Sequence, residues 1–585
     1  MRGGTLRNAH SLRTGVPCIM RYLGSIVLLL VLPGFAQEPQ HVHGGSSAKP
    51  PSTAANRFGS VHFDTSCALA VRTDFNNAVA ILHSFEYDEA HQAFADVARK
   101  DPTCAMAQWG ETMSDIHPLW SEYNASQGAR DSAAARKLAT ENPKTTEREK
   151  AYIAAISEIF TDQAIASQHD KPDALGFSLP SHDAEVKYSA RMAGLHQQFP
   201  ADREATIFYA LSLATIARKA DTAHPDLHHC TALLYPLFAE MPNHPGVAHY
   251  IIHCNDNPEM AAEGLDAARK YAQIAPSSSH ATHMPAHIFA QLGLWDEMIA
   301  SNKLSIRAAE EDTSASPCQK VGNTLHSMSF LVVALAQTGR MSEAKHVLEN
   351  ALTFKSSVPG SALCEDEANE VLSEYVMESG DWTWAKAIKL EVNPLPAKRA
   401  NWWLAIGEAA ARTGDTARAN EAIQALTAMR DANASLPGHT SQNYYEALRL
   451  AVAGWLAQQA GQKTQAVLDM RQSADLLDQL GSNYPIDKPV REMLADLLLI
   501  NGDPASALVE YKVVLLKTPN RFDSLYGAGS VAFAQGDTAT ASMYYKQLLS
   551  FAKGDERPEI VIVRTRAAPT AQNPSDSHVV ATVAP

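Results

Sequence analysis

A period of 34 residues is the feature that most limits how this chain can fold. In the stretch NWWLAIGEAAARTGDTARANEAIQAL, a unit counted from Ala400 carries small or apolar residues at positions 4, 7, 8, 11, 15, 20 and 24. The same pattern fits a unit that starts at Asp366, 34 residues earlier, and units at Lys488 and Phe522, which are also 34 residues apart. Apolar residues three and four apart, with almost no strand-like alternation, predict helices throughout. We therefore expect an all-α repeat protein.

The unit resembles the tetratricopeptide repeat. Small residues at positions 8 and 20 let two helices approach closely, and glycine at position 15 relieves the turn; here they are Gly407, Ala419 and Gly414. The resemblance implies two antiparallel helices per unit, arranged as a right-handed α-α superhelix of about ten to twelve helical hairpins over residues 70–553. Further units start at Val71, Pro245, Ser279, Leu325 and Ala447, with weaker ones near Ala105, His169 and Arg203.

The amino-terminal end predicts export. Arginines at positions 2, 7, 13 and 21 precede an apolar run from Tyr22 to Leu32, and Gly34-Phe35-Ala36 is a small-x-small cleavage site. We predict a signal peptide over residues 1–36, because the apolar run of eleven residues is too short to be a stable membrane anchor. The Pro-, Gly- and Ser-rich residues 37–60 predict a flexible linker.

The rest of the chain divides into three groups of units and a tail. Residues 61–165 should hold amino-terminal units plus extra helices, residues 166–312 the central units, and residues 313–553 the carboxy-terminal units. Within the central group, residues 166–182 predict a long loop of the kind that is often functional. Residues 554–585 predict a disordered tail.

Charge and cysteine content narrow the partners and the compartment. The formal net charge of −15 becomes −19 once the four arginines of the signal peptide are removed, which argues against nucleic acid or an anionic membrane as the partner. We expect a periplasmic or extracellular protein that is not an integral membrane protein after cleavage.

Six cysteines remain after cleavage, and an exported protein permits disulfides. The expected pairing joins nearest neighbours, with buried free thiols as the alternative: Cys67 with Cys104, Cys230 with Cys254, and Cys318 with Cys364.

Two consecutive units carry matching histidine pairs. His249 and His253 occupy positions 5 and 9 of the unit at Pro245, and His283 and His287 occupy the same positions of the unit at Ser279. Residues four apart project from one face of a helix, so we expect the two pairs to lie side by side. In tetratricopeptide arrays, positions 2, 5, 9 and 12 line the concave face. The resemblance therefore implies a histidine-lined groove, which the following residues extend: His280 at position 2, Asp256 at position 12, and His244 before the first helix.

Four imidazoles in this register predict a metal site. Imidazole is a common ligand of zinc and copper, so we name His249, His253, His283 and His287 as candidate ligands of one of these ions. Asp256 would be a further ligand or would orient an imidazole from behind. The alternative is a polar groove whose histidines bind each other or a peptide. Pro285 falls at position 7, so the second helix is expected to begin there and to leave His283 in its lead-in turn.

The same segments are similar to an exported bacterial branch of the repeat family. The shared motifs are HPGxAHYxIH and HxxHMPxHIF around the histidines, and HFDTSC, AILHSFEYDEA and CAMAQWG near the amino-terminal end. This resemblance implies the repeat fold and export, and no particular activity.

Two other groups are weaker candidates for binding. His83 and His117 both stand at position 13 of their units, which would allow a second polar site or simple packing at helix ends. In the unit at Asp366, an acidic inner face would suit a basic peptide or a cation, or would be a solvated surface. Its carboxylates are Glu367, Glu370, Glu374 and Glu378.

The resulting prediction is an exported binding or scaffold protein. It would recognise a peptide, protein or small ligand in its concave groove, with a zinc or copper site among the histidines. The alternative is a metal-dependent enzyme, a hydrolase or an oxidoreductase, that uses the same histidines. The sequence contains no P-loop, dinucleotide-binding glycine motif, G-x-S-x-G, H-E-x-x-H or C-x-x-C motif to indicate another activity.

Overall fold

The structure is a computed structural model of the chain. It describes residues 57–120, 122–161, 181–217, 223–313, 315, 317–357, 362–388, 396–432, 440–481, 484 and 486–567. The predicted signal peptide, nearly all of the predicted linker and most of the predicted loop at 166–182 lie outside these residues.

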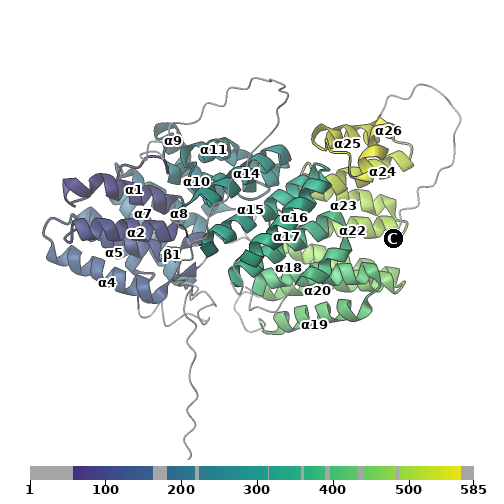
Figure 1. The fold of residues 1–585 in the computed structure, drawn as a ribbon, viewed down its shortest axis with the longest axis horizontal. Helices are drawn as coiled ribbons and strands as arrows, with labels where there is room; N and C mark the ends of the chain where they lie inside the picture. The colour runs from purple at the N-terminus through teal and green to yellow at the C-terminus, as the bar shows by residue number, and fades with distance from the viewer. Residues whose placement is uncertain are drawn as a thin grey trace, which may run out of the picture. The chain divides into compact units, whose positions relative to one another are not determined.

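The described residues form helices that pack as consecutive pairs (Figure 1), which confirms the all-α prediction. After a short 3-10 helix, η2 (Leu69–Val71), the first pairs are α1 (Arg72–His83) with α2 (Tyr87–Lys100), α3 (Ala105–Ser114) with α4 (Ala125–Glu141), α5 (Glu147–Ser157) with α7 (His182–Gln198), α8 (Arg203–Ile216) with α9 (Pro225–Glu240), and α10 (Pro245–Cys254) with α11 (Ala261–Ile274). In the next unit, α12 (Ser279–His283) and α13 (Pro285–Leu292) both pack on α14 (Trp295–Glu311).

The pairing continues to the carboxy-terminal end of the described residues. The pairs are α15 (Pro317–Gln337) with α16 (Met341–Ser357), α18 (Pro396–Thr413) with α19 (Thr416–Ala432), α20 (Thr440–Gln459) with α21 (Lys463–Leu480), α22 (Val490–Ile500) with α23 (Pro504–Lys517), and α24 (Phe522–Ala534) with α25 (Thr538–Phe551). The unit predicted at Asp366 differs, because α17 (Ala362–Ser379) packs on α15 and α16 and is followed by a short 3-10 helix, η4 (Trp382–Ala387).

Small residues at fixed positions allow this pairing. A side chain at Gly407 would place its Cβ 2.6 Å from Cγ1 of Val452 and 3.0 Å from Cβ of Ala422, so glycine is needed for the close approach of α18 to its neighbours. Gly414, at position 15 of the same unit, has a φ of +84°, a conformation that glycine adopts without strain. The template positions therefore have the physical roles that the sequence predicts.

Two local features concern the predicted extra helices and the proline of the histidine region. The extra helices are α4 and α5, and the turn before α4 contains a two-residue antiparallel hairpin of β1 (Ile116–His117) and β2 (Glu122–Tyr123). As predicted, a new helix begins at Pro285, and His283 ends the single helical turn before it.

Units distant in sequence also contact one another. Trp295 Nε1 donates to the backbone carbonyl of Asn520 at 2.8 Å, and the backbone nitrogen of Gly554 donates to the carbonyl of Thr338 at 3.1 Å. In a simple solenoid each repeat contacts only its neighbours. Here the ends of α24 and α25 instead pack against the turns that follow α13 and α15.

The predicted disordered tail begins too early. Residues Pro558–Ala567 form helix α26, which packs on α25. Ile560 and Val563 lie three residues apart on one face of this helix and are completely buried. Residues 568–585 lie outside the described part of the chain.

Two of the three expected disulfides are present. Cys67 is bonded to Cys104, and Cys230 is bonded to Cys254. The third expected pair involves the side chain of Cys318, which lies outside the described structure. In the part of the chain that the structure describes, no helix is both long and apolar enough to cross a bilayer.

A buried arginine joins four helices where the distant units meet. Arg521 precedes α24 and is 1% exposed; its guanidinium pairs with Glu378 of α17 and donates to Oε1 of Glu492 in α22 at 3.2 Å. Gln337 of α15 donates to the other oxygen of Glu378 at 2.6 Å. The two carboxylates are buried with Arg521, which supplies most of their neutralisation, and Lys488 lies 3.9 Å from Oε1 of Glu492.

We expect Arg521→Ala to destabilise the carboxy-terminal units by about 3–5 kcal/mol, because it leaves these carboxylates buried without their cation. The measurement is the denaturation midpoint followed by circular dichroism. Lys150→Ala removes an exposed pair with Glu147 and serves as the control, with an expected cost of about 0.2–1 kcal/mol. Equal effects of the two substitutions would show that the network adds no stability.

Candidate metal centre

The first histidine group contains one of the predicted pairs and a third ring from the next unit. His249 and His253 lie on α10, and His280 lies on α12. Nε2 of His249 is 3.0 Å from Nε2 of His253 and 3.0 Å from Nε2 of His280. Three imidazole nitrogens thus converge within the distances expected for ligands of one ion, at about 2.0–2.1 Å from the metal.

The other ring nitrogen of His249 fixes its tautomer. Nδ1 lies 2.7 Å from the backbone carbonyl of His83, at the end of α1. A carbonyl oxygen only accepts, so Nδ1 carries the proton and Nε2 presents a lone pair to the two neighbouring rings. This arrangement is the usual one for a metal-bound histidine.

The second group contains the other predicted pair and a histidine from a third unit. His283 ends α12, His287 lies on α13, and His326 lies on α15. Their ring nitrogens also converge, and Nε2 of His283 is 3.2 Å from Nε2 of His287. The structure thus divides the four predicted ligands between two groups of three.

Both rings of this pair are held as the same tautomer. Nδ1 of His283 lies 2.8 Å from Oδ1 of Asn302, whose amide orientation is set because its Nδ2 donates to the carbonyl of Met298. Nδ1 of His287 lies 2.8 Å from Oδ2 of Asp256. Each Nδ1 therefore carries a proton, and the two Nε2 atoms face each other. A proton or a metal ion between the two nitrogens makes such a contact favourable.

Asp256 thus contacts Nδ1 of His287 and not the nitrogens that converge. This is the second of the two roles predicted for Asp256, which is to orient an imidazole. Its other oxygen accepts from Nε2 of Gln291 at 3.3 Å. The carboxylate orients the ring of His287, as such partners do in metal sites. His326 is held in a similar way, with Nδ1 at 3.4 Å from Oε2 of Glu367.

Burial keeps the rings in the neutral form that binds metals. Burial lowers the pKa of His249 to about 3. Burial, followed by repulsion from neighbouring histidines, holds the pKa of His253, His280 and His283 well below the usual value. His287 contributes to the repulsion felt by His249, His253 and His280, so the two groups are electrostatic neighbours.

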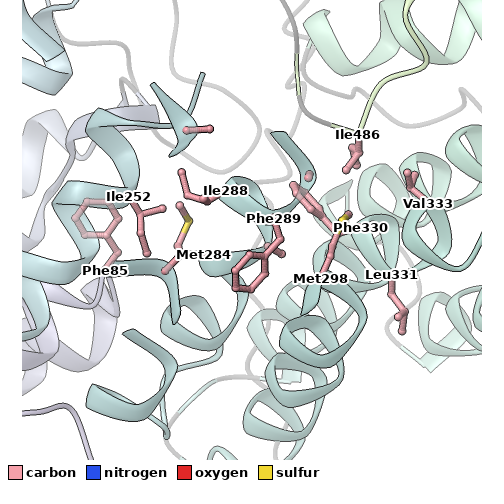
Figure 2. Packing of buried hydrophobic residues seen from close by; sticks show 14 of the residues in the cluster. Phe85, Ile252, Met284, Ile288, Phe289, Met298, Phe330, Leu331, Val333 and Ile486 are labelled. Atoms are coloured by element: carbon pink, nitrogen blue, oxygen red, sulfur yellow. The ribbon is translucent and has the colours of Figure 1, made fainter. Parts of the chain in front are cut away.

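Aromatic side chains pack against the rings of both groups, while His253, His280 and His326 stay half-buried. Phe85 packs against His249, His253 and His280, with ring centroids 4.4, 5.6 and 5.5 Å away. Phe330 covers the second group, 4.6 Å from His283 and 4.7 Å from His287. Figure 2 shows Phe85 and Phe330 on either side of an apolar row formed by Ile252, Met284, Ile288 and Phe289. The groups lie in a largely apolar interior.

Phe85 occupies its place at a conformational cost. It stands at position 15 of the unit at Val71, where other units have glycine, and its φ is +58°. Gly293, Gly414 and Gly536 occupy the same template position with φ of 64°, 84° and 80°. A bulky residue in this region costs about 1–2 kcal/mol. A strained phenylalanine that packs on three histidines points to a functional requirement for the covering ring.

His83 and His244, predicted as groove or second-site residues, belong to a separate buried cluster. Nε2 of His83 is 2.9 Å from Oε2 of Glu204, and Nε2 of His244 is 2.8 Å from Oε1 of the same residue. Nδ1 of His83 is 2.8 Å from the hydroxyl of Tyr250. Although burial opposes ionisation, the two histidines lower the pKa of Glu204 to about 2. This cluster ties α1 and α8 to α10 and so positions the His83 carbonyl behind His249.

His117 does not join His83 in this cluster. Its ring stacks on that of Tyr87, with centroids 4.1 Å apart. The described contacts thus place the two position-13 histidines in different surroundings, which favours packing at helix ends over a shared site.

The predicted acidic face of α17 is also different in the structure. Glu367, Glu374 and Glu378 are buried and Glu370 is half-buried, so the face is neither solvated nor open to a peptide. The reason is the packing of distant units, which brings Arg521 and Lys488 to the end of α17. Glu374 instead lines a cavity whose other polar lining residues include Gln291, Asn401, Tyr444 and Asp487.

Sequence reasoning missed two residues of these sites, and one of them had a usable signal. His326 occupies position 2 of the unit at Leu325, the position that His280 occupies in the unit at Ser279. The 46 residues between these unit starts exceed the period, which hid the correspondence. Glu204 carried no signal, because a lone glutamate on a helix is ordinarily exposed.

Comparisons with known proteins leave the function open. No known protein family and no curated protein matches the sequence. The chain is similar to a tetratricopeptide repeat protein from Parabacteroides merdae, at 13% identity over 49% of this chain and 97% of that chain, with a TM-score of 0.28. It is also similar to the APC/C hetero-tetramer Cut9–Hcn1, at 11% identity over 85% of this chain and 90% of that chain, with a TM-score of 0.31. The helices of this chain pack as consecutive pairs, so its fold is that of an all-α helical-repeat protein.

The buried histidines predict a pH-dependent stability in the metal-free protein. An unfolded histidine takes up a proton near pH 6.5, whereas His249 in the fold resists protonation to about pH 3. The stabilising effect is therefore complete above about pH 6.5 and is lost as the pH falls, by up to about 1.4 kcal/mol per pH unit for each such group.

Denaturation midpoints in the presence of a chelator at pH 7.5 and pH 5.0 test this expectation, and the midpoint should be lower at pH 5.0. His346→Ala, at an exposed position, should show the same pH dependence as the parent, whereas His249→Gln should show less. A midpoint that is independent of pH in this range would mean that the rings are accessible to protons in the fold.

Proposed function

We propose that this chain is an exported metal-binding protein of the helical-repeat type, in which two groups of three histidines each bind one transition-metal ion. The observation that carries the proposal is the contact of 3.2 Å between Nε2 of His283 and Nε2 of His287, while both Nδ1 atoms face oxygen acceptors. Two lone pairs at this distance repel each other, and a proton or a metal ion between the two nitrogens relieves the repulsion. A metal ion satisfies both nitrogens, and His326 supplies a third.

The donor set indicates the kind of metal. Neutral imidazoles with no thiolate favour zinc or copper over magnesium or calcium, which prefer oxygen ligands. Three protein ligands leave a coordination position free, which is typical of centres that bind a further small ligand.

Export is proposed from the amino-terminal sequence, and the two disulfides support it. Cys67–Cys104 and Cys230–Cys254 join residues on successive helices or their adjoining turns. Disulfides of this kind persist in oxidising compartments such as the periplasm. Stacked helix pairs commonly bind proteins, so a protein partner is part of the proposal, with the covered metal groups as internal rather than contact features.

A metal-dependent enzyme is the second candidate, and one observation favours it. Gln291, which donates to Asp256 behind His287, also lines the cavity beside α17. A small substrate in that cavity would lie next to the residues that support the second group. Water bound to a metal with a free position is activated for hydrolysis, and copper in the same position would support redox chemistry.

The metal content of the purified chain tests the proposal. We expect at least two ions of zinc or copper per chain by elemental analysis, and about one fewer in each of His280→Ala and His326→Ala, which alter half-buried positions in different groups. His346→Ala is the control and should keep the parent content. The same metal content in all four proteins, or none in any of them, would refute a histidine metal centre.

The residue behind His287 provides a separate prediction. Asp256→Asn should weaken metal binding at the second group about 10- to 100-fold, because the neutral amide no longer stabilises the ring in its ligating orientation. Competition with a chromogenic chelator measures the affinity, and the other ion should keep the parent affinity. If both ions weaken equally, the two groups are not independent sites; if neither does, Asp256 has no supporting role.

A further inference from the structure

A second kind of polar cluster lies in the amino-terminal units. It is formed where α2, α3 and α4 meet, with His91 from α2, Asp115 at the end of α3 and Asp131 from α4. Nε2 of His91 is 3.3 Å from Oδ2 of Asp131, and one ligand atom from each of the three residues lies within 4.8 Å of the others. None of these residues belongs to the histidine groups or to the cluster around Glu204.

The carboxylates in this cluster are buried. Asp115 is 6% exposed and Asp131 is 7% exposed, and Glu111, which is 8% exposed, adds a third acidic side chain on α3. Both oxygens of Asp131 accept from Nε2 of Gln127 at 2.9 Å, and Oε1 of Glu111 accepts from Gln108 at 2.8 Å. Among the described groups that influence the pKa of Asp115 and Glu111, His91 is the one that can carry a positive charge.

One carboxylate oxygen in the cluster has no donor. Oδ2 of Asp115 is buried and no donor group of the described structure reaches it; a hydrogen bond between the carboxyl groups of Asp115 and Asp131 needs a shared proton. An ionised carboxylate without a partner costs several kcal/mol to bury. Burial, with the neighbouring carboxylate of Asp131, accordingly raises the pKa of Asp115 to about 8. His91 offsets the charge of Asp131, and a further proton or a metal ion would offset the remaining charge of Asp115 and Glu111.

We propose that His91, Asp115 and Asp131 bind one divalent transition-metal ion, with Glu111 as a neighbouring acidic group. Two carboxylates and one imidazole neutralise a divalent cation, and the unpartnered oxygen of Asp115 supplies a ligand that no protein group uses. The ring nitrogen disfavours calcium and magnesium, whereas zinc and manganese accept mixed nitrogen and oxygen donors. The ion would join three helices from two successive units, and thus has a structural role.

Asp115→Asn in the full chain tests this site, with zinc as the probe. We expect elemental analysis after zinc loading to give about one ion fewer per chain than in the parent, whereas the double variant His280→Ala and His326→Ala should keep this ion. Asp96→Asn alters an exposed carboxylate on α2 and is the matched control, with the parent content expected. This pattern separates failure of this site from failure of the histidine groups.

A melt in the presence of a chelator adds a readout that does not depend on metal content. Without metal, Asp115→Asn should melt at a higher temperature than the parent, because the amide removes the charge repulsion. If the cluster instead holds a shared proton, Asp115→Asn will keep the parent zinc content, and the proposal is overturned. Should Asp115→Asn fail to fold, His91→Gln at a half-buried position carries the same expectation of one lost ion, and retention of that ion overturns the proposal equally.

Discussion

Hydrogen bonds to the Nδ1 atoms of the buried histidines fix the tautomers of these rings. The tautomers in turn decide which ring nitrogens of the central units present a lone pair. A carbonyl of His83, an amide oxygen of Asn302 and a carboxylate of Asp256 each hold one ring. If the acceptors were absent, the rings could turn, and a chain of histidine-to-histidine hydrogen bonds would satisfy them without a cation. With the acceptors in place, the Nε2 atoms of His283 and His287 face each other, and a further proton or a metal ion between them satisfies both.

The backbone supplies one of these acceptors, the carbonyl of His83, and the turn that follows it is conformationally strained. This strain argues that the arrangement is functional. The carbonyl of His83 is in position because α1 ends there, and the turn that follows contains Phe85 in a left-handed conformation. Other units place glycine at that point without strain. Here the strain is offset by the packing of the phenyl ring on the first histidine group. Packing alone could be achieved by an apolar side chain elsewhere, so the position of the ring against the histidines is the feature that explains the substitution.

The periodicity predicts what lies on one helix face and between adjacent units, and it predicts little beyond that. It placed His249 with His253 and His283 with His287, and the position of Pro285 predicted the break before α13. It did not predict that each pair would take a third ring from the following unit, because the extra residues before α15 shift His326 out of register. Nor did it predict the burial of Glu374, since contacts between units distant in sequence leave no periodic signal.

The composition of each group has a consequence for how metal binding and folding are linked. In the first group, His249 and His253 lie four apart on α10, so the helix itself fixes their separation. In the second group, His283 and His287 lie on either side of the break between α12 and α13. The third ligand comes from the next unit in both groups: His280 from α12 joins α10, and His326 from α15 joins α12 and α13. An ion at each group would therefore link two units, and its binding free energy would stabilise the interface between them.

In repeat proteins the interfaces between units carry much of the cooperativity of folding. Two ions at successive boundaries would thus make the central units fold as one body, and loss of either ion would weaken the interface at that boundary while the apolar cores of the single helix pairs remain.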